Sequence, residues 1–519
     1  ATDTLAMTID ANQNVGIGVS SLETQNSQYV ALQLGGNANI IAKTSDQASN
    51  PLNILQNAYS APDTNWKKIR EDQSSRYSQL DGVHTFFTDS GTGSADSVIT
   101  WTTNLVLDSN SVISLSNNDG GFSNTIFGKD AGDSDGSGDF NVFVGETAGG
   151  TGTQTDACDN NVGVGYLALE DLTQGQKNSA IGSECAKGLT TGSYNVAYGD
   201  STLANLTTGQ QNAALGRAAL TAVAHDEADN VAVGTSAMEQ AKQDGTASST
   251  NREVKQNIAL GTGALYGGAL TGTNHLEGNI AIGHQAMDAT GANNQIGTIA
   301  IGTSALGALT SGARNTAVGY QAMDELTVGE DNVAFGYGAL GGASTSSENK
   351  RNVALGVSAM AGSNAGASQN VAIGYEALDA NMTADADNNT AVGYISLGAV
   401  TSGASNVAVG SSALADNTTA RYNTAVGASS LENNTNGEHN VAIGLSAGRY
   451  DSSDNDATSP DQCVIIGSGT RFSSATPANQ TIIGYSADGV ADNSVVLGNE
   501  SVTDVYMAQD SGATVHCAG

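Results

Sequence analysis

The feature that most constrains this chain is a five-residue pattern that recurs at a minimum spacing of seventeen residues. The pattern, Asn-x-Ala-aliphatic-Gly, occurs in eighteen copies, of which Asn315-Thr-Ala-Val-Gly319 is one example. Nine of the seventeen intervals between copies are 17 residues long, and none is shorter. A fixed minimum indicates one structural coil per copy, with insertions wherever the interval is longer. The sequence therefore predicts an all-β fold in which seventeen-residue coils stack into a β-solenoid or β-roll.

The fifth position of the pattern is glycine in all eighteen copies, and the chain is expected to turn a corner there. Glycine tolerates positive φ without a steric cost, so we predict a structural role for these residues. The leading Asn is expected to cap the turn or to stack with its equivalents, amide to amide, along the solenoid. The predicted corner glycines are Gly128, Gly145, Gly165, Gly182, Gly199, Gly216, Gly234, Gly261, Gly283, Gly302, Gly319, Gly336, Gly356, Gly374, Gly393, Gly410, Gly427 and Gly444.

The pattern also predicts how the strand of each coil is buried. Val, Thr and Ile dominate the second position and aliphatic residues the fourth, so a short strand places both on one face. The third position points the opposite way and is Ala in fifteen of the eighteen copies. Small apolar residues there indicate that another backbone approaches closely. We therefore predict two buried faces, one inside the coil and the other, the Ala face, against a neighbouring subunit of an elongated parallel homotrimer.

Composition restricts the class of partner. The chain has 52 acidic and 18 basic residues and a net charge of −34. Such a surface repels nucleic acid and anionic membranes, because binding to phosphate requires clustered Lys and Arg. No stretch of 18 apolar residues occurs, so no membrane insertion is expected. The four cysteines show no CxxC spacing, and we expect them to be reduced and to serve in packing, with no metal or cofactor bound.

The spacing of the pattern divides the chain into three predicted parts. Residues 1–120 lack the regular repeat and are expected to form a small β-domain or collar. Two strand-like runs there flank a Gly-Gly-Asn turn and predict a hairpin of residues 30–34 and 40–43. Residues 121–450 are the predicted repeat shaft.

Residues 451–519 are the predicted C-terminal β tip. The pattern persists there with Ile or Val in place of the Ala, which indicates room for larger side chains on that face. A closing strand is expected at residues 502–507. Three long insertions in the shaft, at about residues 239–254, 266–278 and 341–351, are expected to project as candidate side contacts.

The repeat unit resembles the repeats of bacteriophage tail fibres, across residues 121–450. It is less closely similar to the head repeats of trimeric autotransporter adhesins, which have a shorter coil. Residues 9–18 and 504–519 also resemble phage-fibre sequence. In such fibres the latter segment often precedes an endosialidase-type intramolecular chaperone, which cuts itself off at a Ser once the trimer has formed. The resemblance therefore implies a mature trimer whose presumed processing end is Gly519.

The resemblance implies that this chain is a structural, non-enzymatic tail-fibre protein of the virion. Other tail proteins would bind through its N-terminal side. Its distal end would bind a host surface receptor, either a polysaccharide or an outer-membrane component. The alternative is a bacterial cell-surface adhesin or extracellular matrix fibre that uses the same repeat.

Two features of the sequence bear on chemical activity, namely an acidic turn and the absence of a predicted cleft. Asp133, Asp135 and Asp139 are spaced somewhat like a calcium loop but lack its closing Glu, so an exposed acidic turn is the preferred interpretation. Some phage tailspikes degrade polysaccharide, but paired catalytic carboxylates need a cleft of the size of a sugar, which a thin repeat does not supply. We therefore expect no catalytic residues and no bound cofactor.

Overall fold

The structure, a computed structural model, is all-β, as the sequence predicts. It describes residues 7–19, 22, 28–35, 38–43, 51–89, 91, 93–107, 113–114, 124–132, 138–150, 154–155, 157–221, 227–243, 254–270, 274–291, 294–342, 344, 346–347 and 349–505. Within these ranges every regular element is a β-strand, and none is a helix. The chain divides into two compact units, residues 1–166 with 172–174 and residues 167–171 with 175–519, each of which is described by itself.

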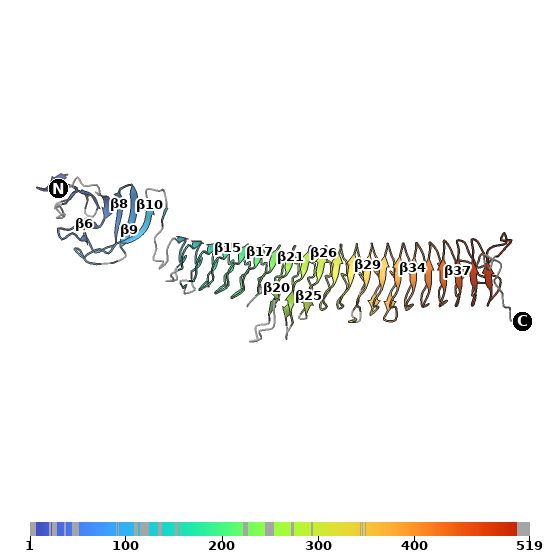
Figure 1. The fold of residues 1–519 in the computed structure, drawn as a ribbon. Coiled ribbons are helices and arrows are strands. Elements are labelled where there is room, and N and C mark those ends of the chain that lie inside the picture. Colours follow the sequence, from blue (N-terminus) through green and yellow to red (C-terminus); the bar gives the residue numbers. More distant parts are fainter. Residues whose placement is uncertain are drawn as a thin grey trace, which may run out of the picture. The chain divides into compact units, whose positions relative to one another are not determined.

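The first unit begins with a mainly antiparallel sheet in the order β1-β2-β3-β4-β5-β8-β9-β10-β11 (Figure 1). Only β2 and β3 are parallel in it, and β6 and β7 form a separate hairpin. The predicted hairpin is confirmed, because β3 and β4 pair antiparallel from Tyr29–Lys43 to Leu34–Ala38. The strands are β1 (Met7–Ile9), β2 (Val15–Ile17), β3 (Tyr29–Leu34), β4 (Ala38–Lys43), β5 (Leu52–Gln56), β6 (Ala58–Ser60), β7 (Trp66–Lys68), β8 (Ser74–Leu80), β9 (Val83–Asp89), β10 (Thr102–Leu107), β11 (Ile113–Ser114), β12 (Thr125–Phe127), β13 (Val142–Val144) and β14 (Val162–Val164).

One face of this antiparallel sheet carries a small apolar core. Ala31, Ile41 and Leu55 alternate with outward-facing residues and are at most 2 % exposed. They pack with residues of the segments that cover the sheet, including the partly buried Trp66 and Trp101. The alternation of inward and outward side chains along β3, β4 and β5 therefore builds a half-buried sheet.

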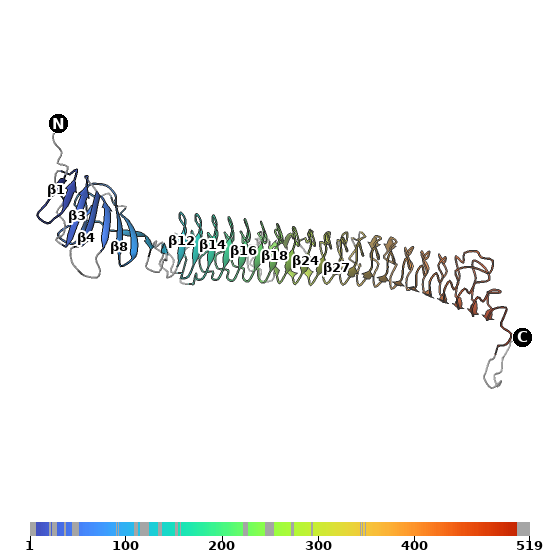
Figure 2. The ribbon, with the colours of Figure 1, turned by 90° about the horizontal axis from the view of Figure 1, so that it is seen from above.

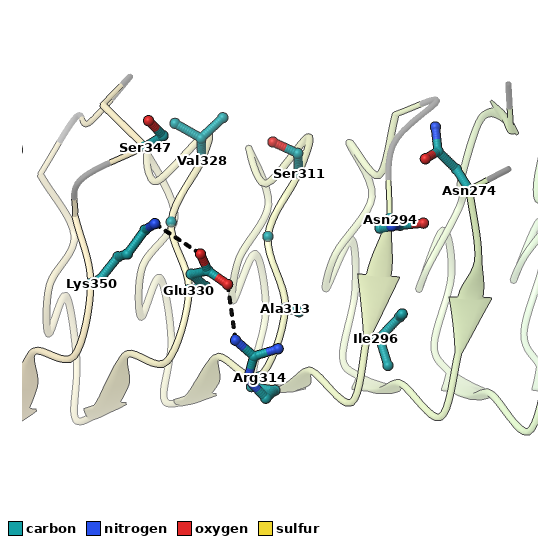
Figure 3. A pocket seen from close by; sticks show the side chains of 12 residues that line it. Asn274, Asn294, Ile296, Ser311, Ala313, Arg314, Val328, Glu330, Ser347 and Lys350 are labelled. Carbon is teal, nitrogen blue, oxygen red and sulfur yellow. Dashed lines mark hydrogen bonds and ion pairs between the residues drawn. The ribbon is translucent and has the colours of Figure 1, made fainter. Parts of the chain in front are cut away.

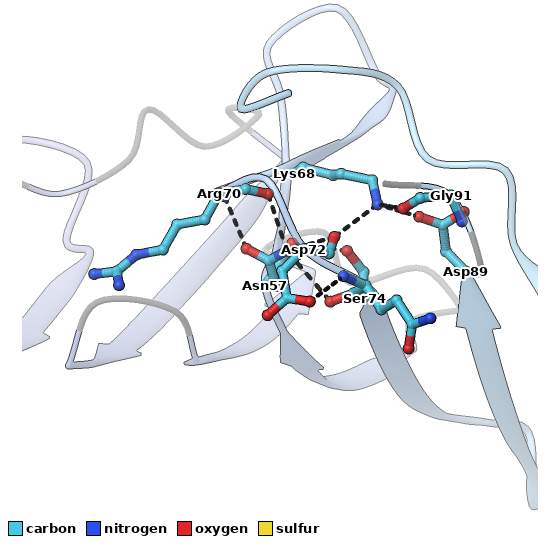
Figure 4. A network of polar contacts seen from close by, with 8 residues as sticks. Asn57, Lys68, Arg70, Asp72, Ser74, Asp89 and Gly91 are labelled. Carbon is cyan, nitrogen blue, oxygen red and sulfur yellow. Dashed lines mark hydrogen bonds and ion pairs between the residues drawn. The ribbon is translucent and has the colours of Figure 1, made fainter. Parts of the chain in front are cut away.

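A buried polar network fixes the covering segment beside this core (Figure 4). Lys68 is only 2 % exposed, and its Nζ lies 2.6 Å from Asp89 Oδ2. The same ammonium donates to the carbonyl oxygens of Asp72 and Gly91. Because a buried ammonium is costly unless it is paired and hydrogen-bonded, these three acceptors explain why Lys68 is tolerated inside the domain.

The second unit is a parallel β-solenoid in which each pentad contributes one short strand to a continuous ladder (Figures 1 and 2). The strands pair in register, so that Ala317 of β27 lies opposite Ala334 of β28. The ladder strands of this unit are β15 (Ser179–Ile181), β16 (Val196–Tyr198), β17 (Ala213–Leu215), β18 (Val231–Val233), β21 (Ile258–Leu260), β24 (Ile280–Ile282), β26 (Ile299–Ile301), β27 (Thr316–Val318), β28 (Val333–Phe335), β29 (Val353–Leu355), β31 (Val371–Ile373), β33 (Thr390–Val392), β34 (Val407–Val409), β35 (Thr424–Val426), β36 (Val441–Ile443), β37 (Val464–Ile466), β38 (Thr481–Ile483) and β39 (Val495–Leu497).

The inserted segments form their own short parallel pairs beside the main ladder. Their strands are β19 (Lys242–Gln243) with β22 (Ala269–Leu270), β20 (Val254–Lys255) with β23 (Leu276–Glu277) and β25 (Gln295–Ile296), and β30 (Asn364–Ala365) with β32 (Met382–Thr383). Insertions of neighbouring coils therefore pair with one another within the described residues. The sequence did not indicate this pairing.

The interior of each coil is lined by small and aliphatic side chains from three sides. In the coil that starts at Asn315, the side chains of Ala317, Ala322, Met323 and Leu326 are all 0 % exposed. The third pentad position thus points into the coil, and the second and fourth positions point outward. Our prediction that the Ala face lies against a neighbouring subunit is wrong. The Ala residues are small because the opposite wall of the same coil approaches the strand closely.

A ladder of buried asparagines, the Asn ladder, connects successive coils. At Asn406, both the backbone N–H and Nδ2 donate to Asn389 Oδ1, at 3.0 and 3.1 Å. Nδ2 also donates to the carbonyl oxygen of Ala420 at 2.8 Å. The Oδ1 of Asn406 in turn accepts the backbone N–H of Asn423. Each amide therefore satisfies backbone groups in a region without water, where an unpaired group is costly.

Thr298 interrupts this ladder between Asn279 and Asn315. Its backbone N–H still donates to Asn279 Oδ1 at 2.9 Å, but its own Oγ1 is buried without a hydrogen-bond partner. We expect Thr298→Asn to restore the missing amide and to raise the free energy of unfolding by about 1–2 kcal/mol, the range for one or two buried hydrogen bonds. Chemical denaturation measures the change. Thr303→Asn, outside the ladder, is the control, and an equal gain there would contradict the ladder explanation.

All eighteen corner glycines adopt positive φ, between +130° and +146°. An added Cβ at Gly410 would lie 2.5 Å from the backbone of Gly427 in the next coil, so neighbouring corners touch backbone to backbone. Most corners contain two further residues with positive φ that are not glycine, for example Gln321 and Met323, both at 54°. Their N–H groups donate in opposite directions, to Thr303 in the preceding coil and to Ala339 in the next.

The solenoid continues into the predicted tip with a wider interior. Ile465 and Ile482 replace the Ala of the strand and are fully buried, together with Phe472, as the larger residues at this position indicated. Strands β37, β38 and β39 pair in the same parallel way as the strands before them. Of the predicted closing strand, residues 502–505 lie outside any strand, and residues 506–507 lie outside the described range.

Candidate functional site

The outward face of the main ladder, here called the sheet face, is an extended apolar surface of the second unit. It consists of the second and fourth pentad positions, which remain half-buried or exposed in a single chain. Because the strands pair in register, like residues follow one another from coil to coil. Its more exposed members are Ile181, Val196, Tyr198, Leu215, Ile258, Val333, Phe335, Leu355, Ile373, Val426, Ile443 and Ile483.

Tyrosines form an interrupted row directly after five of the eighteen corner glycines, at Tyr166, Tyr320, Tyr337, Tyr375 and Tyr394. The rings of Tyr320 and Tyr337 stack with centroids 5.6 Å apart, and those of Tyr375 and Tyr394 are at the same distance. All four side chains are about half exposed. The recurrent Gly-Tyr dipeptide could have revealed this row in the sequence, but only the structure shows that the rings stack.

Continuous apolar surfaces of this kind mark interaction sites in soluble proteins, because isolated monomers rarely expose them. The sheet face also has a repeat that a copy of the same chain would match coil for coil. Its geometry therefore supplies a long and regular surface that suits assembly.

A polar hollow of about 540 Å³ lies beside the inserted strands and is a second candidate site (Figure 3). Gly312 and Gly329 contribute no side chains to it, and polar side chains of neighbouring coils surround it. In Figure 3 Glu330 lies between two cations. Its carboxylate is 2.9 Å from both Arg314 Nη2 and Lys350 Nζ. The remaining polar side chains of the lining are Asn274, Asn294, Ser311 and Ser347.

The charges of this polar hollow satisfy one another. Hydrogen bonds from Lys350 and then Arg314 hold the pKa of Glu330 below its usual value. Arg314 also donates to Asp331 Oδ1 at 2.6 Å, which lowers the pKa of that carboxyl. Among the described lining residues Glu330 is a single carboxylate, whereas glycoside hydrolysis uses a pair.

The other predicted site residues fall partly outside the described residues. Asp133 and Asp135 of the calcium candidate are not described, while the backbone N–H of Asp139 donates to Asp159 Oδ1. The presumed processing end, Gly519, also lies outside the described range. Within that range no group of three or more His, Cys, Asp or Glu side chains is placed to hold a metal ion.

Three cysteines of the described chain, Cys158, Cys185 and Cys463, are free and buried. Burial raises the pKa of Cys158 and of Cys185 to about 12, so these thiols stay protonated and serve in packing. Cys463 occupies an Asn position of the ladder, where its backbone N–H donates to Asn440 Oδ1 at 2.9 Å.

Comparison with known proteins gives no relative: no family model, no curated protein and no solved structure matches this chain. In the described part of the chain, no helix has the length and apolar character needed to cross a membrane.

Proposed function

We propose that this chain is the shaft protein of a homotrimeric phage tail fibre, in which three parallel copies bury their sheet faces against one another. The observation that carries the proposal is the exposed apolar sheet face, which repeats in register along the solenoid. Three such faces can meet around an axis parallel to the solenoid, with every coil of one copy beside the equivalent coil of the next. This arrangement places the apolar contact on the sheet face instead of on the Ala face.

A fibre of this kind acts mechanically and through multivalency. The three identical chains hold three copies of any receptor-binding site at fixed separation, so that avidity replaces high affinity at a single site. The acidic surface keeps the fibre soluble and away from nucleic acid and anionic lipid. The distal end would bind a host polysaccharide or outer-membrane component, and the N-terminal side would bind other tail proteins. The fibre belongs, in this proposal, to the virion.

Charged residues on the sheet face are expected to separate the copies without unfolding them. The wild-type particle should have a native mass of about 156 kDa, three times the 52.1 kDa of one chain. The triple variant Phe335→Asp, Ile373→Asp, Ile443→Asp should fall to about 52 kDa in light scattering, because each carboxylate would have to be desolvated beside its equivalents.

A matched control for this variant places Asp at exposed aromatic residues that precede a pentad strand, namely Phe140, Tyr194 and Tyr422. This variant should keep the mass of the trimer. Circular dichroism of both variants should retain the β-sheet signal. A wild-type mass of one chain, or dissociation of the control alone, would contradict assembly through the sheet face.

The assignment to a phage is tested separately from the assembly. Antibodies against the purified chain, followed by immunogold electron microscopy, should label the tails of virions. Label on the surface of bacterial cells in the absence of virions would instead support a cell-surface adhesin or matrix fibre. That result would overturn the phage proposal while leaving the trimer intact.

A further inference from the structure

The antiparallel sheet of the first unit contains a cation, Arg76, that is enclosed by aromatic rings. Arg76 lies on β8, where its strand neighbours are Leu55 of β5 and Phe87 of β9. The centre of its guanidinium is 3.8 Å from the ring centroid of Phe87 and 5.1 Å from those of Trp66 and Trp101. Burial lowers the pKa of Arg76 to about 10, so the group remains a cation at neutral pH.

No carboxylate compensates this cation among the described residues. Salt bridges of the same domain join Lys68 to Asp89 and Lys67 to Asp63, but none reaches Arg76. The Nε atom of Arg76 is buried and has no hydrogen-bond acceptor. Aromatic rings stabilise a guanidinium through its charge, but they do not accept its N–H groups as a carboxylate does.

Two neighbouring side chains have the same deficiency. Asn53, 1 % exposed, has an Nδ2 without a partner, and the indole Nε1 of Trp101 is likewise buried without an acceptor. All three unsatisfied groups are donors. Buried donors without acceptors are rare in folded proteins, so these three indicate that acceptor atoms are missing beside Arg76. One buried acceptor of the same sheet, Asn39 Oδ1, also lacks a partner, but Asn39 is not among the residues that line the hollow at Arg76.

A hollow of about 500 Å³, here called the Arg76 hollow, lies at this position. Arg76 and Asn53 line it together with the aromatic rings of Tyr29, Trp66 and Phe87. The hydroxyl-bearing Ser78 and Thr85 and the exposed Asp81 also line it. The hollow therefore combines one buried cation, unsatisfied N–H donors, hydroxyl groups and flat apolar walls with one exposed carboxylate.

We propose that the Arg76 hollow binds a carboxylated sugar, such as a uronic acid unit of an acidic polysaccharide. The carboxylate would accept hydrogen bonds from Arg76 and Asn53, and the apolar side of the sugar ring would pack against Trp66 or Phe87. Ser78 and Thr85 would bind the ring hydroxyls. A single negative charge matches the single buried cation, whereas a more highly charged group would meet repulsion from Asp81 and from a chain of net charge −34.

The inference goes beyond the proposed function, because it assigns sugar binding to the N-terminal domain, whereas the proposed function places the host receptor at the distal end. It does not depend on assembly, since the Arg76 hollow lies within one chain. Measuring native mass and ligand binding on the same sample separates the two. A monomer that binds the sugar would contradict the proposed trimer and support sugar binding in the Arg76 hollow. A trimer that does not bind the sugar would support the trimer and contradict sugar binding.

The two tryptophans of the chain, Trp66 and Trp101, both lie beside Arg76, so intrinsic fluorescence reports on this hollow. We expect titration of the full chain with oligogalacturonate or oligoglucuronate to change the tryptophan emission in a saturable way. Neutral oligosaccharides of the same length should cause no saturable change. Acetate at the same carboxylate concentration should bind at least tenfold more weakly, because it lacks the ring.

Two variants and a control decide whether these residues carry the binding. Arg76→Gln should weaken binding of the acidic sugar at least tenfold. Asn53→Leu, which removes the unsatisfied Nδ2 of Asn53 and keeps a side chain of similar size, should also weaken binding and should not lower thermal stability. Arg70→Gln, at an exposed arginine whose side chain points away from the buried network (Figure 4), should leave binding unchanged.

Three results would overturn the inference. The first is the absence of any saturable change with acidic oligosaccharides at millimolar concentration. The second is equal binding of neutral sugars or of acetate, which would remove the carboxylated sugar as the ligand. The third is unchanged binding in a folded Asn53→Leu variant together with a folded Arg76→Gln variant.

Discussion

Replacing Gly410 by alanine is expected to destabilise the solenoid more than any other substitution discussed here. The φ of Gly410 is +140°, a conformation that is essentially restricted to glycine. A Cβ there would lie 2.5 Å from both the carbonyl carbon and oxygen of Gly427 and 2.9 Å from the N of Ala428. Because these are backbone atoms of the next coil, they cannot move without breaking the ladder. We expect a loss of about 3–5 kcal/mol in the free energy of unfolding, from strain and overlap together.

The chain supplies a matched control for this substitution at Gly338. Its φ is +59°, and a Cβ added there would meet nothing within 4 Å. The equivalent residues of neighbouring coils, Gln321 and Ser358, adopt a φ of 54° with a full side chain. Gly338→Ala should therefore cost at most about 1 kcal/mol. Guanidinium denaturation, with hydrogen exchange to locate the loosened coils, measures both variants, and equal losses would show that the corner contact is not the cause.

Removal of one amide from the Asn ladder is the second large expected effect. Asn406→Ala would leave the backbone N–H of Asn423 and the carbonyl of Ala420 without their partners in a region that is 0 % exposed. Buried unpaired groups cost about 1–3 kcal/mol each, so we expect a loss of about 3 kcal/mol. Denaturation should show the loss, and hydrogen exchange should show faster exchange at Asn423.

Asn436→Ala is the control for the ladder variant. Asn436 is exposed, and its amide accepts from Thr419 Oγ1 at 3.0 Å on the surface, where water can replace it. We expect a change within about 0.5 kcal/mol, as for most surface substitutions. A loss as large as that of Asn406→Ala would indicate that the amides matter through local turn geometry rather than through their buried position.

The repeat allowed much of the fold to be predicted. A pentad at a minimum spacing of 17 residues fixed the length of the coil, and its glycine marked the corner that φ values of +130° to +146° now define. The leading Asn was expected to stack or to cap, and in the structure Asn389 and Asn406 stack along the ladder. These features were predictable because they are local: each depends on one residue type at one position of every coil.

The direction in which the strand is buried was not predictable in this way. Alternation shows that Ala317 lies on one side of its strand and Thr316 and Val318 on the other. It does not show which of these two faces points into the interior of the coil. We placed the larger side chains inside, but the coil closes around the small ones, because Ala322 and Met323 of the same coil already fill the space.

The backbone conformation of the corners was not predictable from the sequence either. Gln321 and Met323 have positive φ although neither residue type favours it. Nothing in their identity predicts this conformation. Backbone hydrogen bonds to the preceding and the following coil hold this conformation in place, and such bonds form only when coils are stacked.

The sequence by itself thus determined the period, the corners and the Asn ladder, because identical local chemistry recurs in every coil. Only the tertiary structure decided which face of the strand is apolar and exposed, since that depends on the closure of the coil. It also decided that Asn53, Arg76 and Trp101 share one face of the first unit. They come from separate segments of a single-copy domain, and no period relates them. A repeated pattern allows the structure of the shaft to be predicted from sequence, whereas a binding site that occurs only once can be recognised only from the folded structure.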